Sequence, residues 1–297
     1  MELQSLKRRL GKVRRGVQSS ARLRRKKLAI EKHGLFYEKD LFAHGRDLGV
    51  EANDVLLVHC SMDNLFTYGG SMTGLIKTLL DLVAPNGTLL MPALTTNIFT
   101  MPTMPFDVMR EPTYTGIIPE IFRRMPGVIR SLHPRHSICA LGPLAQDITK
   151  GHEECIYADG AGSPWDRLRL LGAKGLNLGL VPGEASTFLH WIDDIEPEKY
   201  PIPIHVGPVD CVLIDKDKNT MTRSFYNVNR AYVQQPLRFG KKLSDRTVKL
   251  TYLKGIPHSF YNYRSFSEEL VALRDRGIIA YRPKYRIDSL LRYFVKY

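Results

Sequence analysis

A strand–helix–strand unit in the first third of the chain decides its fold class. Residues 55–91 read VLLVHCSMDNLFTYGGSMTGLIKTLLDLVAPNGTLLM. Val55–Val58 and Thr88–Met91 are short apolar runs typical of buried strands. Between them, Gly69–Thr73 leads into an amphipathic helix, and Pro85–Gly87 provides a turn. Strand, helix and strand in this order predict a parallel pair of strands and therefore an α/β fold.

The same alternation continues along the chain, without repeats or a low-complexity linker. It predicts one compact α/β domain with a mixed central β-sheet flanked by helices. A basic helix over residues 1–30 would precede the main domain, residues 31–297, which divides into 31–200 and 201–297. Further helices are expected at residues 37–48, 117–125, 164–171 and 188–194, and another should run from a Ser265-x-x-Glu268 capping box to Arg276. Strands are expected at residues 138–141 and 174–180, and a hairpin is expected from residues 209–214 and 220–225.

Charge is divided unevenly along the chain, which has a formal net charge of +13. Residues 1–27 hold 11 Lys and Arg against Glu2 alone, and residues 223–297 hold 16 against 5 Asp and Glu. The middle, residues 28–222, is mildly acidic, with 16 basic against 24 acidic residues. Basic ends of this kind indicate anionic partners such as phosphates, nucleic acid or a lipid surface.

The N-terminal segment predicts an amphipathic helix, because Leu3, Leu6, Leu10, Val13 and Val17 recur at helical spacing among Lys and Arg. Such a helix could lie on an anionic membrane or nucleic acid, or pack on the domain or on a second copy of the chain. No apolar run approaches the roughly 18 residues of a membrane span. Four scattered cysteines without a Cys-x-x-Cys pair favour reduced thiols, a cytoplasmic protein and no zinc site.

Polar residues follow the first predicted strand. His59, Cys60 and Ser61 come at its carboxyl end, where α/β folds bind ligands. Gly69 and Gly70 would let the following helix present free N–H groups to a phosphate or an amide. The alternative is that these residues only finish a strand and cap a turn. A Cys–His nucleophile at Cys60 is a further possibility, although lone buried cysteines are mostly inert.

The densest cluster of reactive residue types lies in Arg130–Pro143, which reads RSLHPRHSICALGP. Ser131 and Ser137 offer hydroxyls, and Arg130 could pair with a phosphate. The two histidines straddle a proline and lack a third ligand nearby, so they do not predict a metal site. The alternative is a polar turn whose hydroxyls and imidazoles satisfy local backbone groups.

A third candidate segment is Ser186–Asp194, which reads STFLHWIDD. A helix that starts at or near Thr187 places His190 one turn in, with Asp193 or Asp194 on the same side. A carboxylate at that spacing can orient an imidazole and raise its basicity. The alternative is an N-capped helix with solvated acids.

Together these segments resemble the aminoglycoside 3-N-acetyltransferase family, which transfers acetyl from acetyl-CoA to an amino sugar. The turn is similar to its Arg-Ser-x-His-Pro-x-x-Ser-x-x-Ala-x-Gly signature, and residues 186–193 are similar to its Asn-Thr-x-Leu-His-x-Ala-Glu motif. Residues 59–62 followed by Gly-Gly resemble its His-Ser-Ser-Leu pattern, with Cys60 in place of the first serine. The family's Pro-x-Gly-Thr-Leu-x-Met-Pro and Gly-x-Gly-Ser-Pro runs appear at residues 85–92 and 160–164.

The resemblance implies an acetyl-CoA-dependent N-acetyltransferase that needs no metal and transfers acetyl directly within a ternary complex. His190 would be the general base, Asp193 its preferred carboxylate partner and Thr187 a donor to the oxyanion. Residues 31–200 would carry the coenzyme and the catalytic groups, and residues 201–297 would shape the acceptor site. Other possible partners of His190 are Asp194, Glu196 and Asp63. Coenzyme contacts are expected from His59, Ser61, Gly69, Gly70, Arg130, Ser131 and Ser137, with Ser137 the best single candidate.

The acceptor is the harder question. The basic C-terminal third carries aromatic residues such as Tyr226 and Tyr232, which suits an anionic, base-bearing acceptor. We therefore expect a nucleotide-linked amino sugar, such as a dTDP-3-amino-3,6-dideoxyhexose for lipopolysaccharide biosynthesis. An aminoglycoside, with antibiotic resistance as the outcome, is the alternative that suits the acidic middle. A Ser–His–Asp hydrolase built on Ser61 lacks a Gly-x-Ser-x-Gly elbow. The expected partners are this small substrate, weak contact with a membrane surface through the N-terminal helix and a second subunit, but no nucleic acid.

Overall fold

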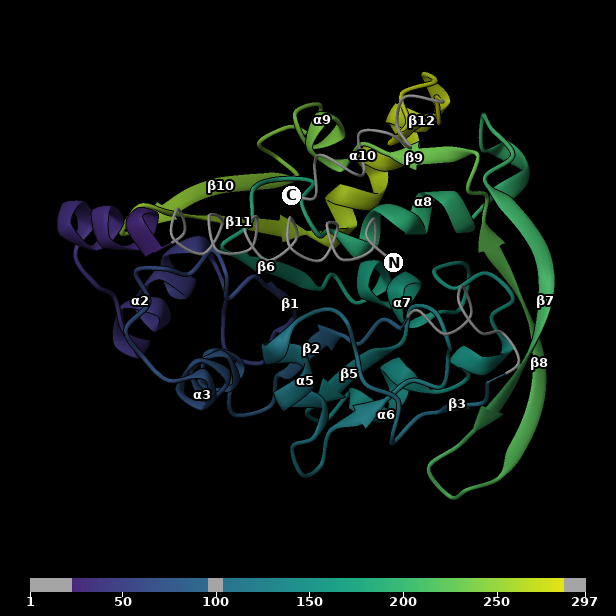
Figure 1. The fold of residues 1–297 in the computed structure, drawn as a ribbon, viewed down its shortest axis with the longest axis horizontal. Helices are drawn as coiled ribbons and strands as arrows, with labels where there is room; N and C mark the ends of the chain where they lie inside the picture. Colours follow the sequence, from purple (N-terminus) through teal and green to yellow (C-terminus); the bar gives the residue numbers. More distant parts are fainter. Residues whose placement is uncertain (1–22, 96–103, 286–297) are drawn as a thin grey trace, which may run out of the picture.

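The computed structural model describes residues 23–95 and 104–285 (Figure 1). Residues 23–33 are helical, in agreement with the end of the expected N-terminal helix. The Leu/Val stripe of residues 3–17 lies outside the described residues, so contact of this segment with a membrane or a second subunit stays a prediction.

A seven-stranded mixed sheet forms the centre of the molecule, with strand order β10-β11-β6-β1-β2-β5-β4. β1 (Val55–Cys60) pairs in parallel with β2 (Thr88–Pro92) on one side and with β6 (Lys174–Leu178) on the other. The parallel pair expected from residues 55–91 is therefore confirmed, as is the mixed α/β class. The remaining strands run antiparallel to their neighbours: β4 (Ile129–Arg130), β5 (Ile138–Leu141), β10 (Val248–Leu253) and β11 (Ile256–Asn262).

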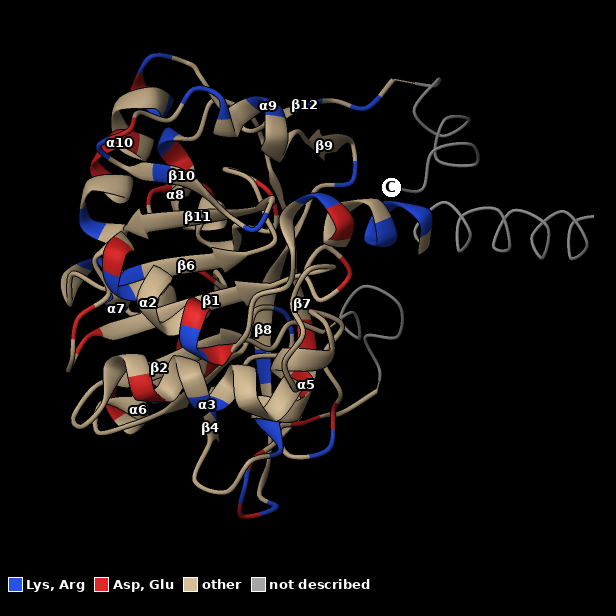
Figure 2. Cartoon of the chain, turned by 90° about the vertical axis from the view of Figure 1, so that its left-hand side faces the viewer, with Lys and Arg blue, Asp and Glu red and all other residues tan. Residues whose placement is uncertain are grey.

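Helices cover both faces of this sheet because successive side chains of a strand point to opposite faces. Leu56 and Val58 of β1 join one apolar cluster, whereas Val55 and Leu57 join another. In Figure 2 the strands β11, β6, β1 and β2 lie one below another, and α2 and α3 are in front of them. The first cluster includes residues of α2 (Glu38–Leu48), α3 (Met72–Val83) and α5 (Ile117–Arg123), and the second includes residues of α6 (Ala145–Thr149), α7 (Pro164–Leu170), α8 (Trp191–Asp194) and α10 (Tyr263–Asp275).

A long hairpin arches along one side of the domain (Figure 1). It consists of β7 (His205–Ile214) and β8 (Thr220–Val228), joined by β3 (Phe106–Asp107) in a three-stranded sheet. The expected hairpin is confirmed, and its strands are longer than the sequence pattern indicated. A smaller two-stranded sheet pairs β9 (Tyr232–Gln234) with β12 (Tyr281–Pro283), and α9 (Pro236–Gly240) follows β9.

Two features of the C-terminal third differ from the sequence-based expectation. The helix expected to start at a Ser265 cap begins earlier, because the Asn262 side chain accepts hydrogen bonds from the N–H groups of Arg264 and Ser265. Ser265 therefore lies inside the first turn of α10, and the expected cap is wrong. The β10–β11 hairpin was not expected; its turn at Lys254 and Gly255 has positive φ at both residues, 47° and 78°.

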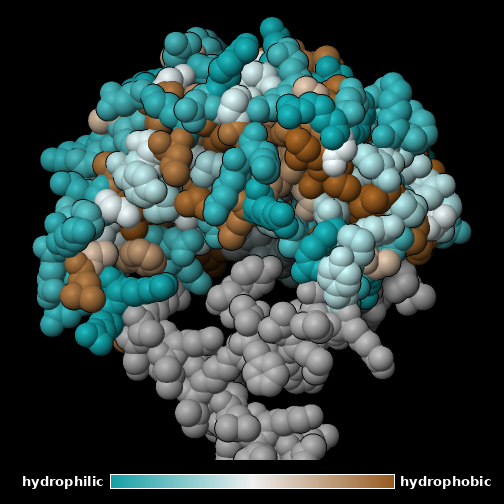
Figure 3. All heavy atoms as spheres, turned by 90° about the horizontal axis from the view of Figure 1, so that it is seen from above, coloured by the Kyte–Doolittle hydropathy of each residue, from teal (hydrophilic) through white to brown (hydrophobic). Residues whose placement is uncertain are grey.

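The surface agrees with the uneven charge of the sequence. Figure 2 shows Lys and Arg along the described part of the N-terminal helix and around the β9–β12 edge. Seen from above, hydrophobic residues form a broken band crossed by hydrophilic ones (Figure 3). None of the helices in the described ranges combines the length and apolar character that a membrane span requires.

Candidate active site

Three segments that are distant in sequence meet at one edge of the central sheet. β1 and β6 are parallel neighbours, so their carboxyl ends lie together, with His59 opposite Asn177. β5 runs antiparallel to β2, and its first residue, Ile138, pairs with Pro92 at the end of β2. The turn before β5 therefore lies at the same edge as the chain that leaves β6. This topology brings the Arg130–Ser137 turn and the Ser186–Asp194 segment together.

The Ser186–Asp194 segment forms a 3-10 helix, η2 (Thr187–His190), that continues into α8. His190 Nδ1 lies 3.1 Å from Oδ2 of Asp193, one turn away, as the sequence spacing predicts. The Asp193 side chain is 2% exposed and the His190 side chain 17% exposed, so a buried carboxylate holds a ring that stays accessible.

Tyr281, on β12, completes this pair and was not expected from the sequence. Its hydroxyl lies 2.8 Å from Asp193 Oδ2, to which it donates, and 3.0 Å from His190 Nδ1. Because the single hydroxyl proton goes to the carboxylate, the tyrosine oxygen must accept from the imidazole, which places a proton on Nδ1. In the neutral ring this is the single ring proton, so Nε2 can accept a proton and act as a base. Burial, followed by the charge of Asp193, raises the pKa of Tyr281 well above its ordinary value, so the hydroxyl stays protonated.

Two other acids considered as partners of His190 are bound elsewhere. Asp194 accepts from His205 Nε2 at 2.7 Å and from the backbone N–H of Asp159 at 2.8 Å. Glu196 pairs with Arg274 at 2.9 Å. Of the acids left open by the sequence, Asp193 is the one for which the structure shows a contact with His190.

Thr187 faces His59 and not a free surface. Its backbone N–H donates to His59 Nε2 at 3.4 Å, and its hydroxyl lies 3.2 Å from the same nitrogen. A nitrogen that accepts the backbone N–H carries no proton, so the hydroxyl also donates to it. Burial lowers the pKa of His59 to about 4, which keeps this ring neutral. His59 thus positions Thr187, and the roles predicted for both residues toward ligands stay predictions.

Cys60 and Ser61 follow His59 at the strand end. Burial raises the pKa of the Cys60 thiol to about 12, so the thiol is protonated at neutral pH. A thiolate nucleophile at Cys60 is therefore disfavoured. Ser61 is half-buried, and its backbone N–H donates to Leu178 at the end of β6. Its coenzyme contact stays a prediction.

The glycines before α3 have a different neighbour from the one expected. The carboxylate of Glu38 accepts from the Ser71 N–H at 3.1 Å and from the Tyr68 hydroxyl at 3.0 Å. A Cβ on Gly70 would lie 2.4 Å from Glu38 Oε1, which explains why glycine stands there. The protein's own carboxylate occupies the helix end proposed for a phosphate. Coenzyme binding by Gly69 and Gly70 stays a prediction.

Arg130 and Ser137 hold the backbone around the turn. Arg130 donates to Ser137 Oγ at 2.9 Å and to the carbonyl of Ala93 at 2.6 Å, and it also reaches the carbonyls of Val108 and Glu111. The Ser137 hydroxyl donates to the same Ala93 carbonyl at 2.6 Å, and this residue has no exposed surface. The interpretation of a polar turn that satisfies local backbone groups fits both residues, and their coenzyme contact is untested.

Ser131 and His133 also bond within the turn. Ser131 Oγ accepts from the Ile138 N–H at 2.9 Å and lies 2.8 Å from His152 Nδ1. His133 Nδ1 accepts from the backbone N–H groups of Arg135 and His136 at 3.2 and 3.3 Å. The coenzyme contact predicted for Ser131 stays a prediction. Across residues 23–95 and 104–285, no group of His, Cys, Asp and Glu is arranged to hold a metal ion.

His136 is different, because it lies against the ring of His190. The two ring centroids are 5.0 Å apart at an interplanar angle of 49°. His136 Nδ1 lies 2.6 Å from Oδ2 of Asp159, a residue without exposed surface. The edge of the sheet thus carries two histidine–carboxylate pairs side by side. The sequence signal for Asp159 would have been its place directly before the Gly160–Pro164 run.

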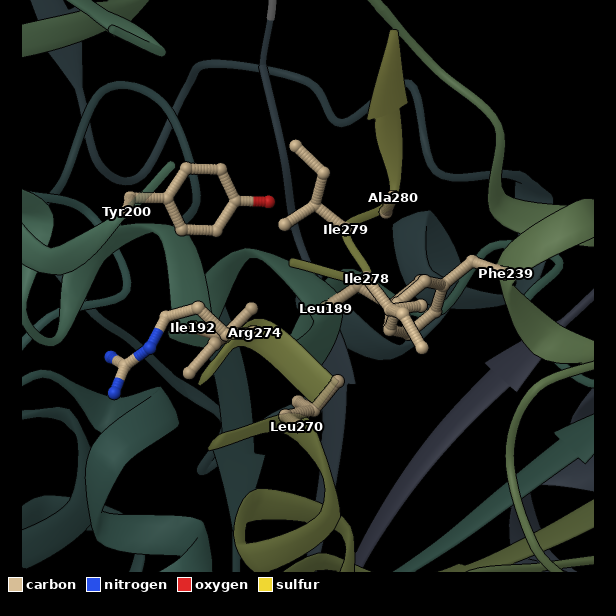
Figure 4. Close-up of a pocket in the computed structure, with 9 residues that line it drawn as sticks. All are labelled: Leu189, Ile192, Tyr200, Phe239, Leu270, Arg274, Ile278, Ile279 and Ala280. Carbon is tan, nitrogen blue, oxygen red and sulfur yellow. The ribbon is translucent and has the colours of Figure 1, made fainter. Parts of the chain in front are cut away.

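A narrow apolar pocket lies next to the Ser186–Asp194 segment (Figure 4). Leu189 and Ile192 from this segment meet Leu270 of α10 and Ile278–Ala280 there. It is too narrow to hold a water molecule, so it is a packing gap that supports the segment and not a ligand site.

These groups can perform acyl transfer to an amine. In its neutral form the His190 ring can accept a proton at Nε2, and Asp193 is placed to stabilise the cation that would form there, a chemistry that uses neither a thiolate nor a metal. The contacts predicted for Arg130, Gly69 and Gly70 with the coenzyme stay predictions. An α/β fold with a His–carboxylate pair at the carboxyl edge of its parallel strands has the arrangement that general-base chemistry requires.

The comparisons with known proteins specify the family. Residues 57–272 match the model of the family described as aminoglycoside 3-N-acetyltransferase. The chain belongs to this family. It is 32% identical over 166 residues to aminoglycoside N(3)-acetyltransferase III of Salmonella sp, which covers 50% of this chain and 57% of the relative. It is 32% identical over 161 residues to aminoglycoside N(3)-acetyltransferase IX of Micromonospora chalcea, covering 48% and 57%. The chain thus matches little more than half the length of these curated relatives.

Solved structures share the fold. Aminoglycoside acetyltransferase AAC(3)-Xa superposes with a TM-score of 0.70 at 20% identity, over 84% of this chain and 97% of that one. AAC-IIIb, solved as a binary complex with CoASH, superposes with a TM-score of 0.68 at 21% identity, over 82% and 97%. The expected fold is therefore confirmed over most of the described domain.

Proposed function

We propose that this protein transfers acetyl from acetyl-CoA to an amine of an aminoglycoside-type amino sugar. The single observation that carries the proposal is the contact of His190 Nδ1 with both Asp193 and Tyr281, which leaves Nε2 free at the sheet edge. Family membership and the CoASH-bound structural relative support acetyl-CoA as the donor.

In the proposed reaction, Nε2 of His190 accepts a proton from the acceptor amine as the amine attacks the acetyl carbonyl. Asp193 holds the Nδ1–H group and stabilises the imidazolium, and Tyr281 keeps the carboxylate in place. Acetyl-CoA, when bound, supplies the activated acetyl group. The remaining task for the protein is to align the amine with the carbonyl, which converts a bimolecular reaction into an intramolecular one.

The comparisons favour the aminoglycoside alternative over the nucleotide-linked amino sugar first expected. The named relatives are aminoglycoside acetyltransferases, and nothing found supports a sugar nucleotide or a role in lipopolysaccharide biosynthesis. The charge near His190 agrees, because Asp193 and Asp194 are buried next to it and would favour a cationic acceptor.

An acceptor panel tests the proposal. The purified full chain is given acetyl-CoA together with sisomicin, gentamicin, a dTDP-linked amino sugar or no acceptor, and free thiol release is followed. We expect turnover with an aminoglycoside and none without an acceptor, with mass spectrometry showing one added acetyl group. Turnover with the dTDP sugar alone would restore the first expectation, and no turnover with any acceptor would refute acetyl transfer.

A further inference from the structure

The His136–Asp159 pair is a second histidine–carboxylate unit beside the base. The two residues come from the turn before β5 and from the loop before α7, and their side chains are 6% and 0% exposed. His136 stands at a position that the family signature leaves open. The 2.6 Å contact and the 5.0 Å distance between the rings of His136 and His190 place this unit within reach of a reacting group held by His190.

The position of the protons in this pair follows from its surroundings. Asp159 Oδ1 is buried and has no hydrogen-bond partner among the described residues, as is also true of Asp193 Oδ1. The two carboxylates differ at Oδ2, because Asp193 Oδ2 contacts both Tyr281 and His190, whereas the hydrogen bond shown for Asp159 Oδ2 is the one with His136. Asp159 thus has less to offset the cost of burying a charge. Burial, followed by the charge of Asp194, raises the pKa of Asp159 well above its ordinary value. Burial, followed by the charge of Arg135, lowers the pKa of His136 well below its ordinary value. Both partners are therefore neutral: Asp159 donates its proton to Nδ1, and His136 carries its own proton on Nε2.

The charged and titratable groups around this pair are consistent with that arrangement. The charge of Arg135 and the rings of His190, His133 and His152 all disfavour a cation on His136. Asp194 and Asp193 disfavour an anion on Asp159, whereas Arg135 favours one. Asp194 differs because, although burial opposes ionisation, the hydrogen bond from His205 lowers its pKa.

We propose that His136 is the general acid of this site: its Nε2–H protonates the sulfur that leaves when the acetyl C–S bond breaks. The inference rests on the proposed acetyl transfer. The electron pair of the C–S bond goes to sulfur, the Nε2 proton goes to the same sulfur, and Asp159 passes its proton to Nδ1. His190 holds the proton taken from the amine at that point. The cycle closes when this one proton returns to the His136–Asp159 pair, so no proton is gained or lost.

The test uses two acetyl donors that differ only in their need for an acid. The thiolate of CoA is a poor leaving group and gains from protonation, whereas p-nitrothiophenolate from p-nitrophenyl thioacetate leaves without it. With one aminoglycoside as acceptor, His136→Gln is expected to lower kcat with acetyl-CoA by about 100-fold and to leave kcat with the thioacetate nearly unchanged. His190→Asn, the matched control, should lower kcat with both donors. An equal loss with both donors in His136→Gln would overturn the inference.

A second measurement does not depend on activity. Nitrogen-15 NMR of the histidine rings in the ligand-free wild-type chain is expected to show His136 as the neutral Nε2–H form at pH 6, with assignment by comparison with His136→Gln and Asp159→Asn. An imidazolium or an Nδ1–H form would overturn the inference. Asp159→Asn can still donate to Nδ1 but has no proton to pass on. In this variant His136 should therefore keep the Nε2–H form while kcat with acetyl-CoA falls. This result tests the role of His136 as the general acid even if His136→Gln does not fold.

The two proposals fail in different ways. If the wild-type chain acetylates no acceptor in the panel, the proposed function and this inference are both refuted. If the wild-type chain is active but the two donors respond alike to His136→Gln, only the role of His136 is refuted.

Discussion

The Arg130–Ser137 turn and the Ser186–Asp194 segment contain the same kinds of residues but use them differently. In the turn, Arg130 and Ser137 direct their donors to backbone carbonyls. In the segment, Asp193 holds one nitrogen of His190 and leaves the other free. The difference teaches that a dense cluster of reactive residue types does not by itself show which of its members can take part in chemistry. What matters is whether the local backbone already uses their hydrogen-bonding groups.

The largest effect is expected at the segment. His190→Asn should lower kcat by about 1,000-fold, because the amide cannot accept a proton in the transition state. The Kd for CoA, measured by calorimetry, and the thermal midpoint should stay close to wild type, because the ring is partly exposed. An unchanged kcat in this variant would contradict the role of His190 as a base and would remove the functional difference between the Ser186–Asp194 segment and the Arg130–Ser137 turn.

Next comes the turn, where the effect should fall on stability. Arg130→Met leaves several buried carbonyls without a donor and should lower the free energy of unfolding by about 3 kcal/mol. The matched control is Arg110→Met, whose side chain is 82% exposed and whose loss should cost less than about 0.5 kcal/mol. Urea unfolding measures both. A raised KM for acetyl-CoA with unchanged stability would instead make Arg130 the coenzyme contact that the sequence predicted.

Low pH should reduce the free energy of unfolding mainly through buried histidines that have no proposed catalytic role, such as His59 and His152. Burial lowers the pKa of His59 to about 4 and of His152 to about 3, from the ordinary histidine value of 6.5. Because the folded-state pKa lies below the unfolded one, each contribution is fully present above pH 6.5 and is lost as the pH falls toward the folded pKa. Urea unfolding should show a loss of about 1.4 kcal/mol per pH unit for each group. His152→Gln should flatten this slope, and a flat profile in the wild type would contradict the assignment of neutral rings.

The smallest effect is expected from Tyr281, the third member of the hydrogen-bonded group in the Ser186–Asp194 segment's surroundings. Tyr281→Phe removes the hydroxyl between Asp193 and His190 and should lower kcat by about tenfold, the value of one hydrogen bond to a charged group. KM should change little, because Tyr281 is buried. Tyr252→Phe is the control, since Tyr252 is 61% exposed on β10. An unchanged kcat in Tyr281→Phe would show that the Tyr281 hydroxyl does not contribute to the function of His190 and Asp193.

Much of the fold could be predicted from local pattern. The apolar runs of β1 and β2, the helix between them and the β7–β8 hairpin follow from residue periodicity and turn residues. The β10–β11 hairpin was missed because β10 alternates irregularly between apolar and polar residues and the buried part of β11 includes His258 and Ser259, so neither strand shows an apolar run. The start of α10 was misplaced because two polar residues, Asn262 and Ser265, both suit a cap, and only packing decides between them.

The sequence by itself determined the α/β class, the spacing that sets His190 and Asp193 on one side of a turn, and the family motifs. These properties depend on neighbours along the chain, whose geometry is fixed by the backbone period. Only the tertiary structure decided that Tyr281 joins this pair, that Glu38 occupies the end of α3, and that His136 lies against His190. Each of these contacts joins residues on separate elements, and they meet only because the antiparallel β5 and the parallel β1 and β6 present opposite chain ends at one edge of the sheet.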